Sequence, residues 1–227
     1  MKKQIVIVGI LLGMMLVAWS GCTEQNSSDN TSSGNETNNQ NNSSSTESIQ
    51  TILAKAETIQ SMYYEITVTT EMSGVESQLT VIKIWQKPPY LKEEITSTTA
   101  GITTNVSMIQ RPEGTYVYNA QEGTYVLTTN TQDLQQSNSE MTQDLLNNQT
   151  ITNLGTDTID GKETTIIQYT PFQQGTLMTA KMWIWNERGV PLQAQFSMTM
   201  QNATITMNYL YNNYSFSEIP DSTFSVT

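Results

Sequence analysis

The sequence predicts a mainly β domain of the α+β class, in which antiparallel strands follow one N-terminal helix. From Tyr64 onward, apolar residues alternate with polar ones in short runs, and a period of two is the pattern of half-buried strands. Glycine, proline, asparagine and aspartate separate these runs, as they do in sheets connected by hairpins. Before Tyr64 the apolar spacing is helical instead. We therefore expect roughly ten or eleven strands after one helix, with a helical insertion among them.

The N-terminal helix is expected over residues 47–61. Residues 44–47, with the sequence Ser-Ser-Thr-Glu, fit a capping box, in which a side-chain oxygen accepts an N–H of the first turn. The apolar residues at helical spacing are Ile49, Ile52, Leu53, Ala56, Ile59 and Tyr63. One face of this helix is therefore apolar and must pack against another part of the domain.

Six strands are expected in the first half of the domain. They cover residues 64–68, 79–85, 90–96, 102–109, 115–118 and 124–128. The second of them must end at Lys87-Pro88-Pro89, because proline has no N–H to donate to a neighbouring strand.

Residues 131–147 interrupt the β pattern and predict one or two short helices. Leu134, Met141 and Leu145 recur there at helical spacing, behind a second capping box at residues 137–140. Strands resume on both sides of Asp160-Gly161, which is a strong signal for a two-residue hairpin turn. The expected strands are residues 151–158, 163–169, 179–185, 192–201, 203–211 and a short one at 214–216. Residues 47–227 then form one domain.

The N-terminus carries the pattern of a lipoprotein signal peptide over residues 1–21. Two lysines precede an apolar run at residues 5–19, and Ser20-Gly21-Cys22 follows it. This run is shorter than the about 20 residues of a membrane span and suits a secretory signal. We expect Cys22 to be lipidated and to become the mature N-terminus. The alternative is an uncleaved signal anchor with an incidental cysteine, and in either case the domain is tied to the outer face of the cytoplasmic membrane.

Residues 22–46 are expected to be the lipidated cysteine and a disordered tether. After Cys22 this segment has no aliphatic or aromatic side chain, so it cannot bury enough apolar surface to offset its chain entropy. It contains five Asn-x-Ser/Thr sequons, which favour glycosylation at a cell surface. These are Asn26, Asn30, Asn35, Asn41 and Asn42. The four sequons of the domain are equally well explained by chance in a chain so rich in asparagine and threonine.

The composition excludes several classes of function. Histidine is absent, which removes the Ser-His-Asp triad, the imidazole general base and most zinc sites. Residues 1–21 contain two lysines and no acidic residue, so their removal changes the formal charge from −11 to −13. A chain this acidic is not expected to bind nucleic acid. Glu93 and Glu94 are the only adjacent carboxylates, but neighbours on a strand face opposite ways. We expect no enzyme, cofactor or metal.

The last strands predict a broad apolar surface. Residues 192–201 alternate Leu192, Ala194, Phe196, Met198 and Met200 with polar residues, and residues 203–211 do the same with Ala203, Ile205, Met207, Tyr209 and Tyr211. Residues 179–185 are apolar on both faces and need cover on both, which a strongly curved sheet with helices in its concavity provides. Nine methionines lie in the domain. They fit either a cavity for apolar ligands or ordinary core packing.

Three motifs resemble those of the LolA/LolB/RseB-like lipoprotein-carrier superfamily, the outer-membrane lipoprotein-sorting-protein-like family. They are residues 85–92 (WQKPPYLK), residues 182–191 (MWIWNERGVP), and residues 211–216 (YNNYSF) followed by 219–224 (IPDSTF). The resemblance covers residues 47–227. It implies an incomplete β-barrel with helices as a lid over an apolar cavity for lipid or acyl chains, and no catalytic residues. The soluble periplasmic carriers lack a lipid anchor, and the tether, acidity and sequons here look archaeal. Shuttling to an outer membrane is therefore not implied.

These observations predict a cell-surface lipoprotein that binds a lipid, an acyl chain or a lipidated protein in a lidded half-barrel. The alternative is a non-catalytic sensor or scaffold that binds a protein partner through its sheet. The expected ligand-binding residues are Trp183, Trp185, Phe196, Met198, Met200, Met207 and Tyr209 of the sheet, with Leu134, Met141 and Leu145 of the lid. Which face of the sheet lines the cavity stays open at this point.

Overall fold

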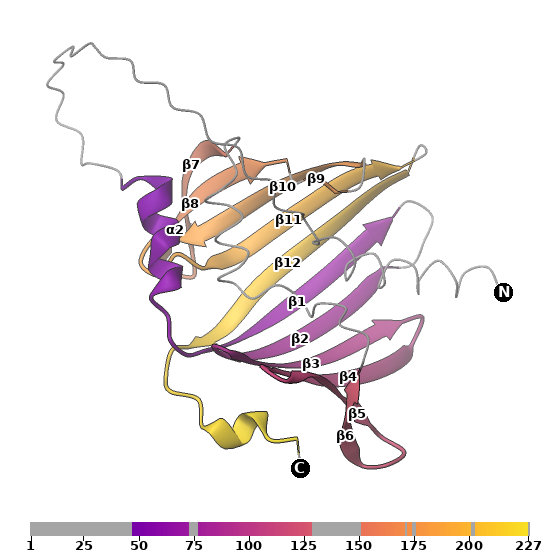
Figure 1. The fold of residues 1–227 in the computed structure, drawn as a ribbon. Coiled ribbons are helices and arrows are strands. Elements are labelled where there is room, and N and C mark those ends of the chain that lie inside the picture. Colours follow the sequence, from indigo (N-terminus) through magenta and orange to yellow (C-terminus); the bar gives the residue numbers. More distant parts are fainter. Residues whose placement is uncertain are drawn as a thin grey trace, which may run out of the picture.

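The computed structural model describes residues 47–72, 77–128, 151–170, 172–173, 176–200 and 203–226. In these ranges the chain forms one α-helix, twelve strands and a short 3-10 helix (Figure 1). No helix of the described part is long and apolar enough to cross a membrane. The signal peptide, Cys22, the tether and the helical insertion predicted at residues 131–147 all lie outside the described residues.

Helix α2 (Ile49–Glu57) is shorter than predicted, and its cap is a different residue. Ser48 is the N-cap, because its Oγ accepts the N–H of Thr51 at 3.1 Å. Glu47 is not part of the cap and forms an ion pair with Lys55 at 2.6 Å. The helix also ends at Glu57 and not at residue 61 as predicted, and Tyr63, which continued its apolar spacing, belongs to the first strand. Its apolar side chain suits either a helical or a strand face, and pairing with the sheet decides the outcome.

The sheet is antiparallel throughout, as predicted. Its strands are β1 (Met62–Met72), β2 (Gln78–Lys87), β3 (Tyr90–Thr99), β4 (Ile102–Arg111), β5 (Gly114–Asn119), β6 (Thr124–Thr128), β7 (Thr152–Ile159), β8 (Lys162–Tyr169), β9 (Phe172–Gln173), β10 (Thr176–Trp185), β11 (Pro191–Met200) and β12 (Ala203–Ser215). Eleven of the described strands follow the order β6-β5-β4-β3-β2-β1-β12-β11-β10-β8-β7, and β9 pairs with β10. The edge strands β6 and β7 do not pair with each other in the described part, so this sheet is an incomplete barrel.

The turns explain where several strands begin and end. β2 stops at Lys87 and β3 starts at Tyr90, with the two prolines between them. Asp160 and Gly161 both have positive φ, at 50° and 73°, as the predicted hairpin turn between β7 and β8 requires. The separate short strand predicted at residues 214–216 is instead the end of β12, which continues past an irregularity at Asn213. Strand β9 was not predicted.

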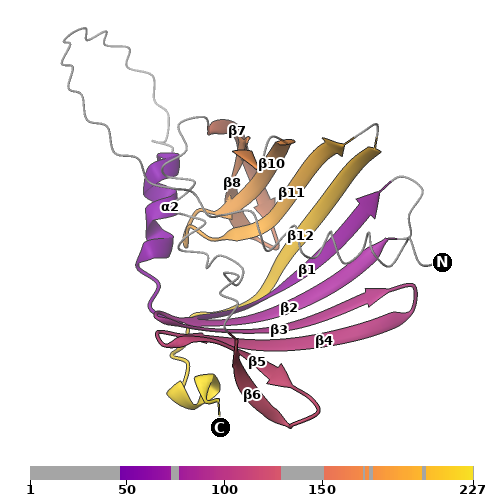
Figure 2. The same ribbon diagram turned by 45° about the vertical axis from the view of Figure 1, so that its right-hand side comes forward.

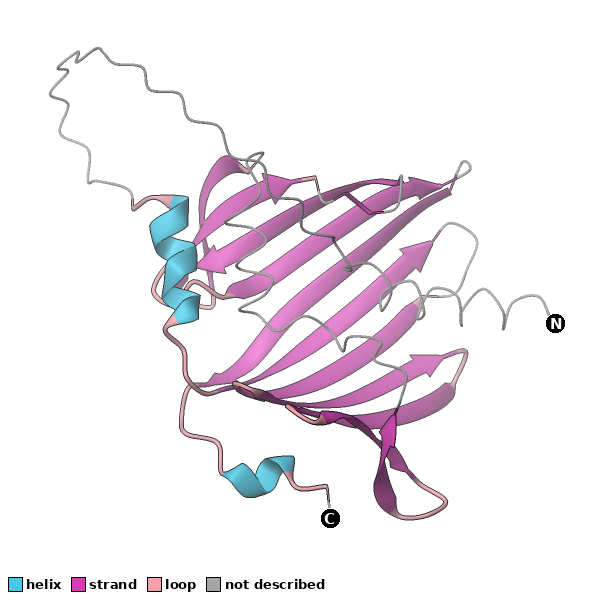
Figure 3. Cartoon of the chain, in the orientation of Figure 1, coloured by secondary structure: helices cyan, strands magenta, loops and turns pink. Residues whose placement is uncertain are grey.

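The sheet curves strongly, and its two faces carry different elements (Figure 2). Helix α2 lies on the concave side, which we call the inner face. The C-terminal 3-10 helix η1 (Asp221–Phe224) lies on the opposite side, the outer face. Figure 3 shows how little of the described domain is helical beside the large sheet. The main core lies on the inner face, where α2 buries Ile52, Leu53 and Ala56.

A smaller apolar cluster fixes η1 to the outer face. It consists of Ile109, Ile219 and Phe224, with Trp85 and Tyr90 packed against it. The rings of Tyr90 and Phe224 stack with centroids 5.6 Å apart. Ile219 and Phe224 are the two buried apolar residues of the C-terminal motif, and their burial in this cluster holds the motif against the outer face.

Candidate binding site on the inner face of the sheet

The register of β10, β11 and β12 brings several predicted ligand-binding residues together on the inner face. Phe196 pairs with Ala180 on one side and with Met207 on the other. Met198 and Tyr209 alternate with these residues on the same face. The rings of Phe196 and Tyr209 meet edge to face, with centroids 5.2 Å apart. Met207 and Tyr209 are buried, whereas Phe196 and Met198 are partly exposed.

The other predicted residues are placed differently or lie outside the described part. Met200 continues the alternation of Phe196 and Met198 and pairs with Ala203 by backbone register. Trp183 lies on the outer face, because it alternates with the buried Met182 and Ile184. Trp185, at the end of β10, packs with Phe216 against the main core. The predicted lid residues Leu134, Met141 and Leu145 lie outside the described residues, as do the tether sequons. Trp183 therefore cannot contribute to one site with the inner-facing candidates.

The two tryptophans of β10 have polar and cationic partners of their own. Trp183 donates its Nε1–H to Asp157 at 3.3 Å, and the Lys181 Nζ lies 4.5 Å from its ring centroid. Trp185 contacts Phe216 at 6.0 Å between centroids and lies 5.5 Å from the Nζ of Lys162. These contacts account for Trp183 as packing on the outer side of β10 and for Trp185 as packing with Phe216 against the main core.

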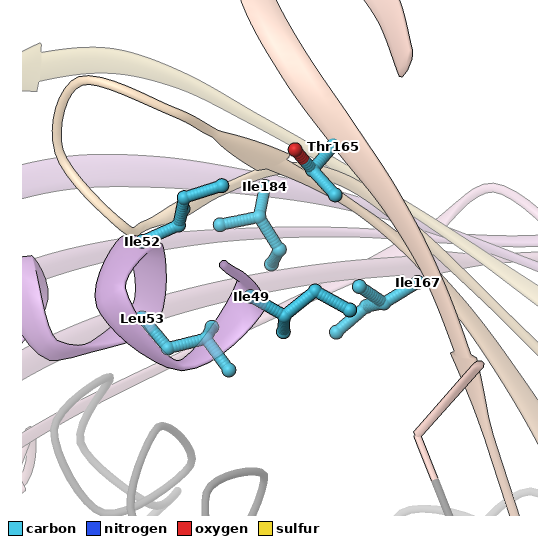
Figure 4. Close-up of a pocket in the computed structure, with 6 residues that line it drawn as sticks. All are labelled: Ile49, Ile52, Leu53, Thr165, Ile167 and Ile184. Atoms are coloured by element: carbon cyan, nitrogen blue, oxygen red, sulfur yellow. The ribbon is translucent and has the colours of Figure 1, made fainter. Parts of the chain in front are cut away.

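Helix α2 leaves only a small hollow where it meets the sheet (Figure 4). The residues that line it are Ile49, Ile52, Leu53, Thr165, Ile167 and Ile184, and it has almost no enclosed volume. Ligand pockets typically have about 300–1,000 Å³. This hollow between α2, β8 and β10 is therefore too small to hold a lipid chain by itself.

A row of aromatic rings crosses the inner face at its centre. Tyr64 stacks on Tyr214 at 5.4 Å and lies 6.4 Å from Tyr211. Tyr211 in turn stacks on Tyr209 at 6.4 Å. Burial raises the pKa of Tyr209 to about 12 and raises the pKa values of Tyr64 and Tyr211 further. These phenols are therefore neutral over the physiological pH range and form an apolar floor with polar tips.

Glu93 lies in the middle of this apolar surface. Its cross-strand partners are Ile84 on β2 and Met108 on β4, and only 1% of it is exposed. Neither carboxyl oxygen has a hydrogen-bond partner among the described residues. Burial raises the pKa of Glu93 to about 8, because removal from water disfavours the charged form. The carboxyl is therefore mostly protonated at neutral pH.

Glu94 has the opposite environment, as the alternation of strand residues predicts. It is 42% exposed on the outer face and pairs with Lys92 at 3.0 Å. Strand alternation correctly predicted that the two carboxylates face opposite ways, but the burial of Glu93 was not predicted. The available signal was the alternation Leu91, Glu93, Ile95, which places one acid within an apolar series.

Away from α2, the inner face carries apolar side chains that remain uncovered. Val106 pairs with Ile95, and Val126 pairs with Val117, which itself pairs with Met108. Ile102 alternates with Val106 on the same side of β4. The exposed fractions of Ile102, Val106 and Val126 are 71%, 40% and 43%. We call these three residues the open apolar strip.

The inner face offers apolar contact surface, which suits the binding of a ligand. The described inner-facing side chains of β1 to β4 and β10 to β12 are apolar or uncharged at pH 7, apart from the acid Glu93 among them. The described residues hold no group of three or more aspartate, glutamate or cysteine side chains that could bind a metal ion. Fold and site thus define an open, curved antiparallel half-barrel with an apolar inner face.

Comparison with known proteins places this half-barrel near one group of solved structures. A LolA superfamily protein from Nitrosomonas europaea matches with 14% identity over 79% of this chain and 98% of that chain, at a TM-score of 0.39. LprF from Mycobacterium bovis matches with 12% identity over 73% of this chain and 92% of that chain, at a TM-score of 0.40. A chain of the MucA/MucB complex of Pseudomonas aeruginosa matches with 12% identity over 79% of this chain and 61% of that chain, at a TM-score of 0.46.

These structures include a member of the superfamily that the sequence motifs resemble. No protein-family model matches the sequence, and no curated protein matches it. At such identities the likeness concerns the fold alone, and the function must be derived from the residues of this chain.

Proposed function

We propose that this chain is a lipid-anchored cell-surface protein whose inner sheet face binds a hydrophobic ligand. The ligand is a lipid, an acyl chain or a lipidated protein. The observation that carries the proposal is the open apolar strip, which continues the buried core of the inner face toward β6. Exposed apolar side chains that adjoin one another mark binding surfaces more often than isolated ones do.

The strip, and not the hollow beside α2, is the place for this ligand. A chain that covered about 200 Å² of apolar surface would gain about 5 kcal/mol from burial, before the entropy of association is subtracted. The hollow beside α2 offers almost no accessible surface. The ligand therefore lies along β3 and β4, with the aromatic row at one end.

The anchor keeps this surface close to a membrane. The apolar run at residues 5–19 and the following Cys22 support lipidation at the outer face of the cytoplasmic membrane. A flexible tether over residues 23–46 would span roughly 25–30 Å, with glycosylated asparagines along it. The inner face can then receive ligands from the membrane to which the chain is fixed.

Native mass spectrometry of the full-length chain tests the proposal. After exposure to an extract of membrane lipids, the wild-type protein should carry bound lipid. Val106→Gln should lower the bound fraction by about tenfold, because it removes apolar contact from the strip. Leu210→Gln is the matched control, since Leu210 is 46% exposed on the outer face. Equal loss in both variants, or no bound lipid in the wild type, would contradict the proposal.

A protein partner is the second candidate, and strand β7 favours it. Seven of its eight residues, Thr152 to Thr158, are exposed. β7 is an edge of the described sheet, and such an edge can accept a further strand. A lysine at Leu154, which is 45% exposed, should then abolish capture of the partner and leave lipid binding intact. Loss of lipid binding in Leu154→Lys would argue against this separation of the two surfaces.

A further inference from the structure

Glu93 is a buried acid that has no basic residue near it among the described inner-facing residues of β1 to β4. The described inner-facing residues of β1, β2, β3 and β4 include no lysine or arginine. Both carboxyl oxygens lack a hydrogen-bond partner within the described part of the chain. Buried polar groups in folded proteins are almost always paired, so an unpaired acid in an apolar surface indicates a missing partner.

The buried carboxyl lies beside side chains that are only partly covered. Its neighbours Met108 and Ile95 are only partly buried, and Ile95 pairs directly with Val106 of the open apolar strip. From Glu93 the strand continues to Thr99, the cross-strand partner of Ile102, over a length of about 20 Å, and the polar pair Ser97 and Thr104 lies on the same face between Val106 and Ile102. A polar group beside Glu93 and an apolar chain along the strip would therefore belong to one elongated molecule.

The net negative charge of the chain favours a cationic polar group on the ligand. With an acidic excess of 21 carboxylates over 10 basic residues, the protein attracts cations and repels anions. A ligand carboxylate beside Glu93 would add a second acid to a face without a base. An ammonium group would instead donate charge-assisted hydrogen bonds to both oxygens.

We propose that Glu93 anchors an amphiphile that carries an ammonium group, with its apolar chain along Ile95, Val106 and Ile102. This inference rests on the proposed function and names the class of its ligand. Binding converts the neutral carboxyl to a carboxylate and releases its proton to solvent. The released proton balances the charge of the incoming ammonium group, so the complex has the same net charge as the unliganded protein.

The linked proton gives the site a characteristic pH dependence. In the unliganded protein the pKa of Glu93 is about 8. The affinity for an ammonium ligand should therefore rise by up to about tenfold per pH unit between pH 6 and 8 and then level off. Tyr64 is the other titratable group that faces Glu93, and burial raises its pKa far above this range. Lys92 and Glu94 lie on the outer face, where they pair with each other.

The test compares decylamine, decanol and decanoate on the full-length chain in nonionic detergent by native mass spectrometry. Decylamine should bind at least about tenfold more tightly than decanol at pH 8, and decanoate should bind most weakly. Glu93→Gln keeps the shape of the side chain and should remove both the preference for decylamine and its pH dependence. Glu94→Gln is the control and should retain both.

Two results would overturn the inference. If decanol binds and decylamine binds no more tightly, the ammonium anchor is wrong while the hydrophobic site stands. If Glu93→Gln abolishes decanol binding as well, Glu93 acts on the structure of the site and not on the ammonium group. Absence of binding by all three compounds would refute the proposed function itself.

Discussion

The substitution Glu93→Gln should remove a large part of the pH dependence of folding. Glutamine has the same size and shape, but it does not ionise. In the folded protein the pKa of Glu93 is about 8, against 4.5 for an unperturbed glutamate. The unfolded chain exposes this side chain to water, so 4.5 describes the unfolded state.

The sign follows from the protons bound in each state. Below pH 4.5 Glu93 is protonated in both the folded and the unfolded state, so its burial as a neutral acid costs no part of the free energy of unfolding through ionisation. Between pH 4.5 and 8 the unfolded chain loses the proton while the folded protein keeps it. Each pH unit in this window therefore lowers the free energy of unfolding by about 1.4 kcal/mol. The total loss approaches about 5 kcal/mol above pH 8, and about 3 kcal/mol of it is present at pH 7.

Urea unfolding of the full-length chain, followed by tryptophan fluorescence at pH 5, 6, 7 and 8, measures this effect. Other carboxylates contribute to the pH dependence in every variant, so the informative quantity is the difference between wild type and Glu93→Gln. That difference should grow in favour of the variant by about 4 kcal/mol between pH 5 and pH 8. Glu94→Gln should follow the wild type. A constant difference across the pH range would show that Glu93 is not buried as an acid, and the reasoning would fail.

Four further substitutions test other parts of the protein. Gly189→Ala should destabilise the fold by more than about 3 kcal/mol, because a Cβ there would collide with the α2 backbone at a φ of +72°. Gly161→Ala has the same backbone strain but open space around it, so urea unfolding should show a loss of only about 1–2 kcal/mol. Phe224→Ala should lower stability by about 3 kcal/mol because it empties the outer cluster under Tyr90. Cys22→Ser should move the chain from the membrane fraction to the soluble fraction, and retention in the membrane would favour an uncleaved anchor.

The sheet could be predicted because its signals are local. Alternating side chains gave each long strand, and the prolines at 88 and 89 gave the boundary between β2 and β3. The ends of elements were less accessible. Tyr63 fits the helical spacing of the preceding residues, yet its pairing with Trp85 and Ser215 places it in β1. That pairing joins segments far apart in the sequence, and no local pattern reports it.

The shared face of several candidate residues could be predicted for the same reason. The apolar alternation of β11 and β12 placed Phe196, Met198, Met207 and Tyr209 on one face, as their register does, and their role in binding stays a prediction. The alternation of β10 could not say which of its two apolar faces would be concave, because curvature depends on the packing of the whole sheet. The uncovered state of Ile102 likewise depends on which elements stop short of it, and not on its own neighbours in sequence.

The position of Glu93 connects the energetics of the fold to its proposed use. The buried acid lowers stability by about 3 kcal/mol at pH 7, a large share of the 5–15 kcal/mol that typically separates folded from unfolded domains. An exposed apolar strip beside it adds a risk of aggregation. Both features lie on the same face, and each is unfavourable in the empty protein. An amphiphile with an ammonium group would pair the acid and cover the strip at once, whereas a strand added at the β7 edge would relieve neither. The inner face is for this reason the stronger of the two candidate surfaces.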